Sequence, residues 1–448
     1  MKSNLASRRS FLKTTALGMM AASTATARSE EKIIGANDAV RVAFVGVANR
    51  GRQVINAFKN CPNMQIAGFA DVDSETLNKT GETFAPEADR VKDFRAFLDR
   101  DDIDAIVIAT PDHWHAWQTI ESCKAGKDVY VEKPLSQTIY EGRMMVNAAR
   151  KYKRVVQVGI HRRSGPLYQK LYNENILERI GKVTACNSGH CSNMYPDGIG
   201  RAKPTAPPAT LDWDLWLGPR NQEYQENIAP YKFRWWGDYS SQIANNGVHF
   251  LDMMRWLLHE KGPTSVCAMG GKYIVNDDRT IPDTMIACFE FASGCLFEFH
   301  HYEASGNAIM ATNEHGNPLG FFEMRGTQGT LFAYDNHYII RPERPGQFQS
   351  KTPRAEWEDW HLEKSGTGNL EITDLHAQNF LDCIRSRELP NGDVEEGHLS
   401  TIMPHIANIS LAVGQRLTWD PETERFTNSE EANSMLHYEY RAPWKLEL

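Results

Sequence analysis

V-A-F-V-G-V-A-N-R-G, residues Val42 to Gly51, is the stretch that decides the fold class of this chain. Its first four residues are typical of a short buried strand, and Gln53–Lys59 follows with the spacing of a helix. Because backbone N–H groups at a helix start attract a pyrophosphate, the turn between strand and helix is expected to bind a dinucleotide. The residues expected in this turn are Gly46, Ala48, Asn49, Arg50 and Gly51. Ala48 stands where a second glycine is expected, so its methyl group should displace the pyrophosphate slightly.

Strand-like and helix-like segments alternate from this turn to Gly159. The expected strands are Met64–Ala70, Ala105–Ala109, Asp128–Val131 and Val155–Gly159, and the expected helices are Asp73–Phe84, Trp114–Ala125 and Ile139–Lys151. This order predicts parallel βαβ units, and therefore a doubly wound Rossmann domain over residues 40–160.

Asp71 ends the second expected strand, where a carboxylate can accept hydrogen bonds from ribose hydroxyls. This residue favours NAD(H), because the 2′-phosphate of NADP(H) would meet a like charge. Arg50 in the glycine turn and Arg52 directly after it carry the positive charge that a 2′-phosphate requires, so NADP(H) remains the alternative cofactor. A βαβ turn that binds no ligand is the other interpretation of the pattern.

Length and composition indicate a soluble protein of two domains. The 448 residues exceed the usual size of one core, and 41% of them are hydrophobic and 24% charged. The formal net charge is −8 without a basic block, which argues against nucleic acid or an anionic membrane as partner. The eight cysteines show neither C-x-x-C nor zinc spacing, so we expect no structural disulfide, and the histidines give no metal site.

Two further motifs follow expected strands: A-T-P-D-H-W-H-A at Ala109–Ala116 and V-E-K-P-L-S at Val131–Ser136. Both lie at the sheet edge where a doubly wound fold binds its ligand. With the glycine turn, they resemble the Gfo/Idh/MocA oxidoreductases. Further motifs are similar to the exported bacterial branch of this family: L-D-W-D-L-W-L-G-P (211–219), Y-K-F-R-W-W (231–236), N-G-V-H-F-L-D (246–252) and H-A-Q-N-F-L-D-C-I-R-S-R (376–387).

The resemblance implies a role for individual residues. Lys133 corresponds to the catalytic lysine and His249 to the catalytic histidine, and both would lie near the reacting hydroxyl. Asn245 occupies a position that is often Asp in relatives, so His249 is expected to be less basic or Lys133 to carry more of the proton transfer. The residues that would contact the cofactor, besides the glycine turn and Asp71, are Thr110, Pro111, His115, Glu132 and Lys133, with Pro134 beside them.

These residue types suit the oxidation of a secondary alcohol. A histidine can take the hydroxyl proton near neutral pH, and an ammonium group stabilises the developing alkoxide. The leading interpretation is an NAD(P)-dependent oxidoreductase that acts on a ring hydroxyl of a sugar, cyclitol or glycoside. The alternatives are a redox-neutral enzyme that cleaves or epimerises a glycoside through a transient keto-sugar, and a periplasmic sugar-binding protein without turnover.

Residues 161–448 are expected to form an α+β domain for substrate binding and oligomerisation. Its expected strands are Val183–Ser188, Ser265–Ala268, Thr284–Phe291 and Cys295–His301, with a hairpin turn at Ser293-Gly294. An open antiparallel sheet backed by helices fits this pattern and the family, whose members commonly use the exposed sheet face to form homo-oligomers. Residues 193–230 lack periodicity and are expected to form a lid or an arm.

Candidate substrate-binding residues of this domain are Trp235, Trp236, Arg162 and Arg163, besides His249. Indole rings stack on sugar rings, and guanidinium groups donate hydrogen bonds to hydroxyls or a carboxylate. The alternatives are that the tryptophans anchor a core and that the arginines form a salt-bridged hinge.

The N-terminus has the pattern of a targeting peptide. S-R-R-S-F-L-K at Ser7–Lys13 precedes a mild apolar run and the small-residue exit Ala25–Ala27, and it resembles the twin-arginine export signal. We therefore expect a signal peptide over 1–27, a linker over 28–39 and a periplasmic protein; the apolar run is too short for a membrane anchor. Because that route carries folded proteins, the cofactor is expected to be loaded before export and tightly bound.

Overall fold

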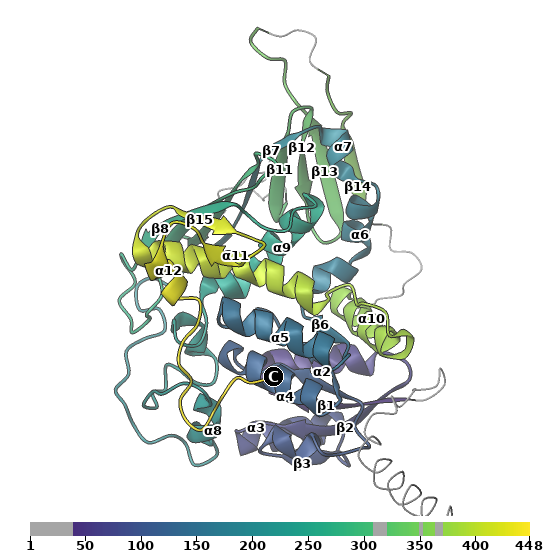
Figure 1. Cartoon of the computed structure of the whole chain (residues 1–448), viewed down its shortest axis with the longest axis vertical. Coiled ribbons are helices and arrows are strands. Elements are labelled where there is room, and N and C mark those ends of the chain that lie inside the picture. The colour runs from purple at the N-terminus through teal and green to yellow at the C-terminus, as the bar shows by residue number, and fades with distance from the viewer. Residues whose placement is uncertain (1–38, 308–319, 349–352, 363–370) are drawn as a thin grey trace, which may run out of the picture. The chain divides into compact units, whose positions relative to one another are not determined.

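The computed structural model describes residues 39–307, 320–348, 353–362 and 371–448. The expected signal peptide (1–27) and all of the expected linker except Ala39 lie outside these residues. Residues 40–448 form a compact unit, and no helix within the described residues is long and apolar enough to cross a bilayer (Figure 1).

The first part of this unit is a six-stranded parallel sheet in the order β3-β2-β1-β4-β5-β6. Strand order reverses between β1 and β4, which makes this the switch point where doubly wound sheets bind ligands. The strands are β1 (Val40–Val45), β2 (Met64–Ala70), β3 (Asp89–Val91), β4 (Ala105–Ile108), β5 (Asp128–Val131) and β6 (Val156–Val158). The predicted Rossmann sheet is confirmed. The short edge strand β3 was not predicted, because its sequence has no apolar run.

The helices of this part are α2 (Asn49–Lys59), α3 (Ser74–Phe84), the 3₁₀ helix η1 (Phe94–Phe97), α4 (Asp112–Lys124) and α5 (Ile139–Lys151). Side-chain caps begin three of them, α3, η1 and α5, whereas α2 and α4 have none. Asp73 accepts a hydrogen bond from the Glu75 N–H, and Thr138 and Glu141 form a reciprocal capping box.

The second sheet has ten strands in the order β14-β13-β12-β11-β7-β10-β9-β8-β15-β16. It is mostly antiparallel, as expected, but β7 and β10 pair in parallel. The predicted hairpin joins β9 to β10, and Gly294 in its turn adopts a φ of +82°. The strands are β7 (Val183–Cys191), β8 (Ser265–Gly271), β9 (Thr284–Glu290), β10 (Leu296–Tyr302), β11 (Phe322–Gly326), β12 (Gly329–Ala333), β13 (His337–Pro342), β14 (Glu358–His361), β15 (Leu417–Asp420) and β16 (Arg425–Phe426).

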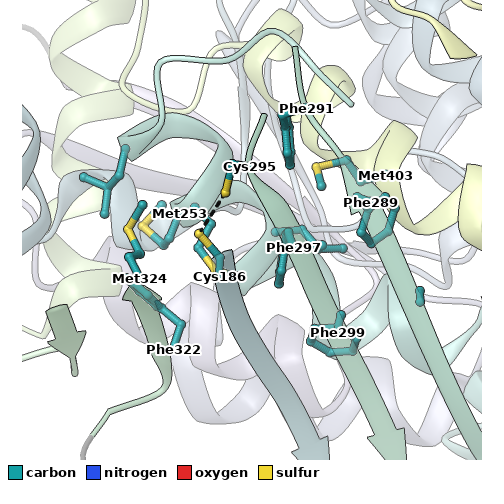
Figure 2. Close-up of a cluster of buried hydrophobic side chains, with 14 of the residues drawn as sticks. Cys186, Met253, Phe289, Phe291, Cys295, Phe297, Phe299, Phe322, Met324 and Met403 are labelled. Carbon is teal, nitrogen blue, oxygen red and sulfur yellow. Dashed lines mark hydrogen bonds between the residues drawn. The ribbon is translucent and has the colours of Figure 1, made fainter. Parts of the chain in front are cut away.

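One face of this sheet packs on helices and forms the largest core. Figure 2 shows how the phenylalanines of β9 and β10, which alternate with more exposed residues, point into this core. The Sγ atoms of Cys186 and Cys295 lie 3.7 Å apart within it, and both are free thiols. The helices are η2 (His161–Ser164), α6 (Pro166–Asn173), α7 (Ile176–Ile180), α8 (Trp213–Leu217), η3 (Lys232–Trp235), the π-helix η4 (Ile243–Gly247), α9 (Val248–Leu257), α10 (Ile372–Ser386), α11 (Val394–Val413) and α12 (Glu430–Ser434).

The region 193–239, called the arm below, has a small core of its own. It leaves β7, contains α8 and η3, and encloses a cluster built around Trp216, Tyr224 and Trp236. An antiparallel β-bridge between Asp73 and Leu211 joins it to the Rossmann part beside β2, through the hydrogen bonds Ser74 N–H to Thr210 O and Asp212 N–H to Val72 O, each of 2.9 Å.

A buried ion-pair network connects the segment that follows β6 with α9 and α11. Both carboxylate oxygens of Asp252 accept hydrogen bonds from Arg163, the shortest of 2.8 Å, and Ser400 Oγ donates to the same carboxylate at 2.6 Å. Glu396 lies 2.9 Å from Arg163 and also pairs with Arg255. The Asp252 side chain is 1% exposed, so its charge depends on these donors.

We predict that Asp252→Ala lowers the free energy of unfolding by about 3–5 kcal/mol, because it leaves buried guanidinium charge without its carboxylate. Glu422→Ala, which removes the solvent-exposed pair with Lys261, should cost less than about 1 kcal/mol. Urea unfolding of both variants measures the difference, and equal midpoints would contradict a structural role for the network.

Candidate active site

The glycine turn between β1 and α2 is too tight for side chains at its two glycines. Gly46 has a φ of +78°, and a Cβ there would lie 2.7 Å from the carbonyl carbon of Ala109. A Cβ on Gly51 would lie 2.0 Å from Gly46 O. Helix α2 begins at Asn49 after Ala48, with no side-chain cap and no acidic residue in its first turn. This arrangement suits a pyrophosphate at the helix start, with the Ala48 methyl group beside it.

Asp71 lies beside this turn at the end of β2. Its Oδ2 accepts a hydrogen bond from the Val47 N–H at 2.8 Å, and its Oδ1 accepts one from the Asp73 N–H at 3.0 Å. Burial raises the pKa of Asp71 to about 6. Each oxygen keeps a lone pair that can accept a hydroxyl hydrogen, so the residue suits a ribose.

The turn and Asp71 open into a cleft with about 1220 Å³ of empty space. The Rossmann part lines it with Ala48, Asn49, Arg50, Thr110 and Pro111, among others. The arm lines it with apolar residues that include Leu211, Trp216, Pro230 and Phe233. The structure therefore brings the arm over the predicted dinucleotide site. For residues 193–230 the sequence allowed either a lid or an arm.

Arg50 lines the cleft and is paired with Glu132, which is buried behind it and does not line the cleft. Arg50 Nε donates to Glu132 Oε1 at 2.9 Å, and Glu132 is 3% exposed. A Cβ on Gly159 would lie 2.9 Å from the same carboxylate oxygen, so the glycine at the end of β6 makes room for it. Arg50 is thus held by a carboxylate within the site.

His115 connects the two predicted cofactor motifs. Its Nδ1 lies 2.8 Å from Pro134 O and its Nε2 lies 2.9 Å from Thr110 O. The ring is 1% exposed and does not line the cleft, so its contacts position the two loops. Thr110 in turn donates to Gln118 Oε1 at 2.7 Å.

Lys133 reaches from the end of β5 to the π-helix η4. Its Nζ donates to the main-chain O of Asn245 at 2.6 Å and to Asn245 Oδ1 at 3.1 Å, and the Lys133–Pro134 bond is cis. Burial lowers the pKa of Lys133 to about 8, against the raising effect of Glu132 and Asp112. Both of its contacts are neutral oxygens, which stabilise the ammonium less than a carboxylate would.

His249 lies in the first turn of α9, directly after η4. Burial and the neighbouring positive charges of Lys133 and Arg162 hold its pKa well below the usual range, so the ring is neutral. Its ring packs edge-to-face on His161 with centroids 5.1 Å apart. The buried Nδ1 has no hydrogen-bond partner among the described residues. The structure thus brings Lys133, Asn245 and His249 together, although Asn245 lies in a π-helical turn.

The predicted substrate arginines are both paired with carboxylates. Arg162 Nε donates to Asp335 Oδ1 at 2.8 Å, and Arg163 belongs to the buried Asp252 network. This is the arrangement of the salt-bridged alternative. The two tryptophans lie in the arm: Trp235 Nε1 donates to the Glu303 carboxylate at 2.9 Å, and Trp236 Nε1 donates to Asn227 O at 2.8 Å within the arm's core. Trp235 ends the 3₁₀ helix η3 and does not lie on a strand.

The cleft also contains an aromatic group that no motif in the sequence predicted. Trp114 and Trp117 of α4 line the cleft together with Trp444, near Arg95. The spacing of Trp114 and Trp117 on one helix face was a signal, but nothing local pointed to Trp444. Within the described residues no group of three or more His, Cys, Asp or Glu is arranged to hold a metal ion.

Comparison with protein families gives three matches. Residues 40–160 match the GFO_IDH_MocA model described as "Oxidoreductase family, NAD-binding Rossmann fold". Residues 227–403 and 365–446 match two models described as "Oxidoreductase family, C-terminal alpha/beta domain".

Curated relatives match part of the chain. A glycosyl hydrolase family 109 protein of Saccharopolyspora erythraea is 30% identical over 177 residues, which cover 34% of this chain and 39% of that protein. One of Shewanella pealeana is 31% identical over 120 residues, which cover 25% of this chain and 26% of that protein. The alignments thus span less than half of the relatives' length.

Solved structures share the fold. A levoglucosan dehydrogenase in complex with NADH and levoglucosan superposes with a TM-score of 0.65 at 18% identity, covering 85% of this chain and 99% of that one. The WlbA dehydrogenase of Bordetella pertussis, in complex with NADH and UDP-GlcNAcA, has a TM-score of 0.61 at 18% identity and the same coverage. The matching models and this fold show that the chain belongs to the Gfo/Idh/MocA family of NAD-dependent oxidoreductases.

Proposed function

We propose that this enzyme oxidises a ring hydroxyl of a sugar, cyclitol or glycoside with a bound NAD. The observation that carries the proposal is the partly buried ammonium of Lys133, held on Asn245 beside a neutral His249 at the end of β5. The sugar complexes of the two structural neighbours support the substrate class.

The residues of the site divide the work of alcohol oxidation. When bound, NAD supplies a hydride acceptor for the carbon that carries the hydroxyl. Lys133 would donate a hydrogen bond to the hydroxyl oxygen and stabilise the negative charge that develops on it. His249, which is neutral, would receive the hydroxyl proton, either directly or through Lys133.

A redox-neutral cycle is the second candidate, and the position of the arm over the cleft favours it. The arm covers the dinucleotide site and is hydrogen-bonded to the Rossmann part, which supports a tightly bound cofactor that is regenerated in place. While a ring carbon is a ketone, the neighbouring C–H is acidic; a base in the site could remove that proton and a leaving group could depart. The curated relatives are named glycosyl hydrolases, which supports this outcome.

The cofactor proposed is NAD rather than NADP. Asp71 would repel a 2′-phosphate, and the nearby basic side chains are engaged: Arg52 with Thr80, Lys92 with Asp212, and Arg95 with Asp93.

Domain roles and location extend the proposal beyond the site. We propose that residues 161–448 bind the sugar and form a homo-oligomer, and that residues 1–27 direct export of the folded protein to the periplasm. The mature N-terminus is then expected near Arg28, and N-terminal sequencing of protein recovered from the periplasm checks this; an intact Met1 would contradict it.

We predict that Lys133→Ala lowers kcat/KM by about two orders of magnitude or more, because it removes the group that stabilises the alkoxide. Lys151→Ala, on the exposed face of α5, should leave the rate unchanged. The assay follows keto-sugar formation by mass spectrometry across a panel of glycosides. Wild-type turnover in the Lys133 variant would remove the catalytic part of the proposal, and wild-type protein that binds sugars without turnover would favour the binding-protein alternative.

The pH profile separates the two roles open to Lys133. Below a pKa of about 8 the side chain is charged, so a rate that depends on the ammonium falls as pH rises through about 8. Lys133→Arg keeps the charge and should lose this fall. A wild-type rate that instead rises through pH 8 would make neutral Lys133 the base and contradict its assignment as alkoxide stabiliser.

We predict deuterium exchange without net reduction of cofactor. In heavy water, a closed cycle places deuterium on the carbon next to the oxidised one, because that proton is lost while the ketone exists, and free NADH does not accumulate. Mass spectrometry of the sugar and absorbance at the NADH band measure both quantities. Strict dependence on added NAD, with one NADH released per sugar, would identify an ordinary dehydrogenase instead.

A further inference from the structure

The end of the chain contributes a wall of the cofactor cleft. Trp444 lines the cleft and is 8% exposed, although it belongs to the last residues of the chain, 438–448, called the tail below. In Figure 1 the yellow end of the chain lies beside α4, and ring contacts place Trp444 against that helix.

Ring packing holds Trp444 in this position. Its centroid lies 4.9 Å from those of Trp114 and Trp117, at interplanar angles of 82° and 86°, and the Arg95 guanidinium lies 5.5 Å from its ring. Such edge-to-face contacts are favourable beyond the area they bury. Trp444 Nε1 is buried and has no hydrogen-bond partner in the described part of the chain, so no side-chain hydrogen bond fixes the ring.

Arg441 ties the tail to the arm. Its side chain donates to Asp214 Oδ1 at 2.6 Å, to Asp214 O at 3.1 Å and to Gly218 O at 3.0 Å. Its backbone N–H donates to Pro219 O at 2.9 Å. These acceptors lie in and directly after α8, so the tail holds the end of the helix that carries the cleft residue Trp216.

A further contact fixes the start of the tail on the Rossmann part. Tyr440 Oη donates to Glu141 Oε1 at 2.5 Å, and Glu141 forms the capping box of α5 with Thr138. The guanidinium of Arg220 lies 3.2 Å from the ring centroid of Tyr438. The tail thus bridges α5, the arm and α4, all of which belong to or support the cleft.

We propose that the tail is a strap of the dinucleotide site that retains the cofactor, with Trp444 as its cleft-facing residue and Arg441 as its attachment to the arm. The proposal rests on the proposed function, because it takes NAD as the occupant of the cleft. The arm is already joined to the Rossmann part beside β2 and at α4, where Trp114 Nε1 donates to Trp216 O at 2.9 Å, so the tail supplies a further attachment. Movement of the arm away from α4 would have to break the Arg441 contacts.

The test compares Trp444→Ala and Arg441→Ala with Trp444→Phe and with the matched control Lys445→Ala, whose side chain is exposed. Each full-length protein is purified, its NAD(H) content is measured after denaturation, and NADH release is followed by fluorescence in a chase with excess NAD. We expect both alanine variants to release NADH about tenfold faster or more, which corresponds to about 1.4 kcal/mol. The phenylalanine variant should stay closer to wild type than the alanine variant does, since it keeps an aromatic ring.

Circular dichroism melting verifies that each variant is folded, and Trp444→Phe and Lys445→Ala extend the comparison if an alanine variant is not. Wild-type release rates in Trp444→Ala and Arg441→Ala would overturn the strap while leaving the proposed function intact. If one alanine variant is unfolded, the other decides: NADH release at the rate of Lys445→Ala would overturn the strap. If both are unfolded, Trp444→Phe should release NADH faster than Lys445→Ala because its ring is smaller, and equal rates would overturn the strap. A wild-type protein that neither contains nor binds NADH would overturn both.

Discussion

The buried carboxylate of Asp252 fixes the relation between the two halves of the proposed catalytic site. Arg163 follows the last strand of the Rossmann sheet, and Asp252 lies one turn after His249 on α9. Neither charged group is accessible to water, so the carboxylate of Asp252 depends on all of its hydrogen-bond donors. Besides Arg163, these donors include Ser400 of α11. The position of His249 relative to the end of β5 therefore depends on a contact that takes no part in binding the cofactor.

Lys133 shows how this arrangement sets the chemistry. Its partly buried ammonium group donates to the main-chain and side-chain oxygens of Asn245, neither of which is charged. Burial therefore outweighs the more distant carboxylates, and the pKa falls to about 8. The same positive charge contributes to keeping His249 neutral, so the two groups differ in protonation near neutral pH. A carboxylate at position 245 would stabilise the ammonium and raise its pKa.

The arm joins cofactor binding to the second domain. Its own hydrophobic core keeps it folded, and Glu303 on the sheet side accepts hydrogen bonds from Trp235, which anchors the arm to the second domain. The opposite attachment, at Leu211 beside β2, places apolar side chains over the glycine turn. Because the arm is held by both domains, the cleft is part of the folded structure and not a groove on the Rossmann surface.

The sequence by itself determined the elements whose signals are local. Alternating apolar runs and helical spacing predicted β2, β5 and α5 to their terminal residues, and the glycine turn, Asp71 and the E-K-P motif predicted the edge of the sheet that forms the site. Short elements without an apolar period, such as β3 and the π-helix η4, carried no such signal.

Only the tertiary structure decided which distant residues meet. The parallel pairing of β7 with β10, the pairing of Arg163 with Asp252, and the placement of Trp444 against Trp114 join residues far apart in the chain. Such contacts depend on how whole elements pack, and the residues involved are compatible with several partners: an arginine can bind a sugar or a carboxylate, and a tryptophan can line a cleft or fill a core. The residue types limited the chemistry, and the packing of the two sheets, the arm and the tail selected the geometry.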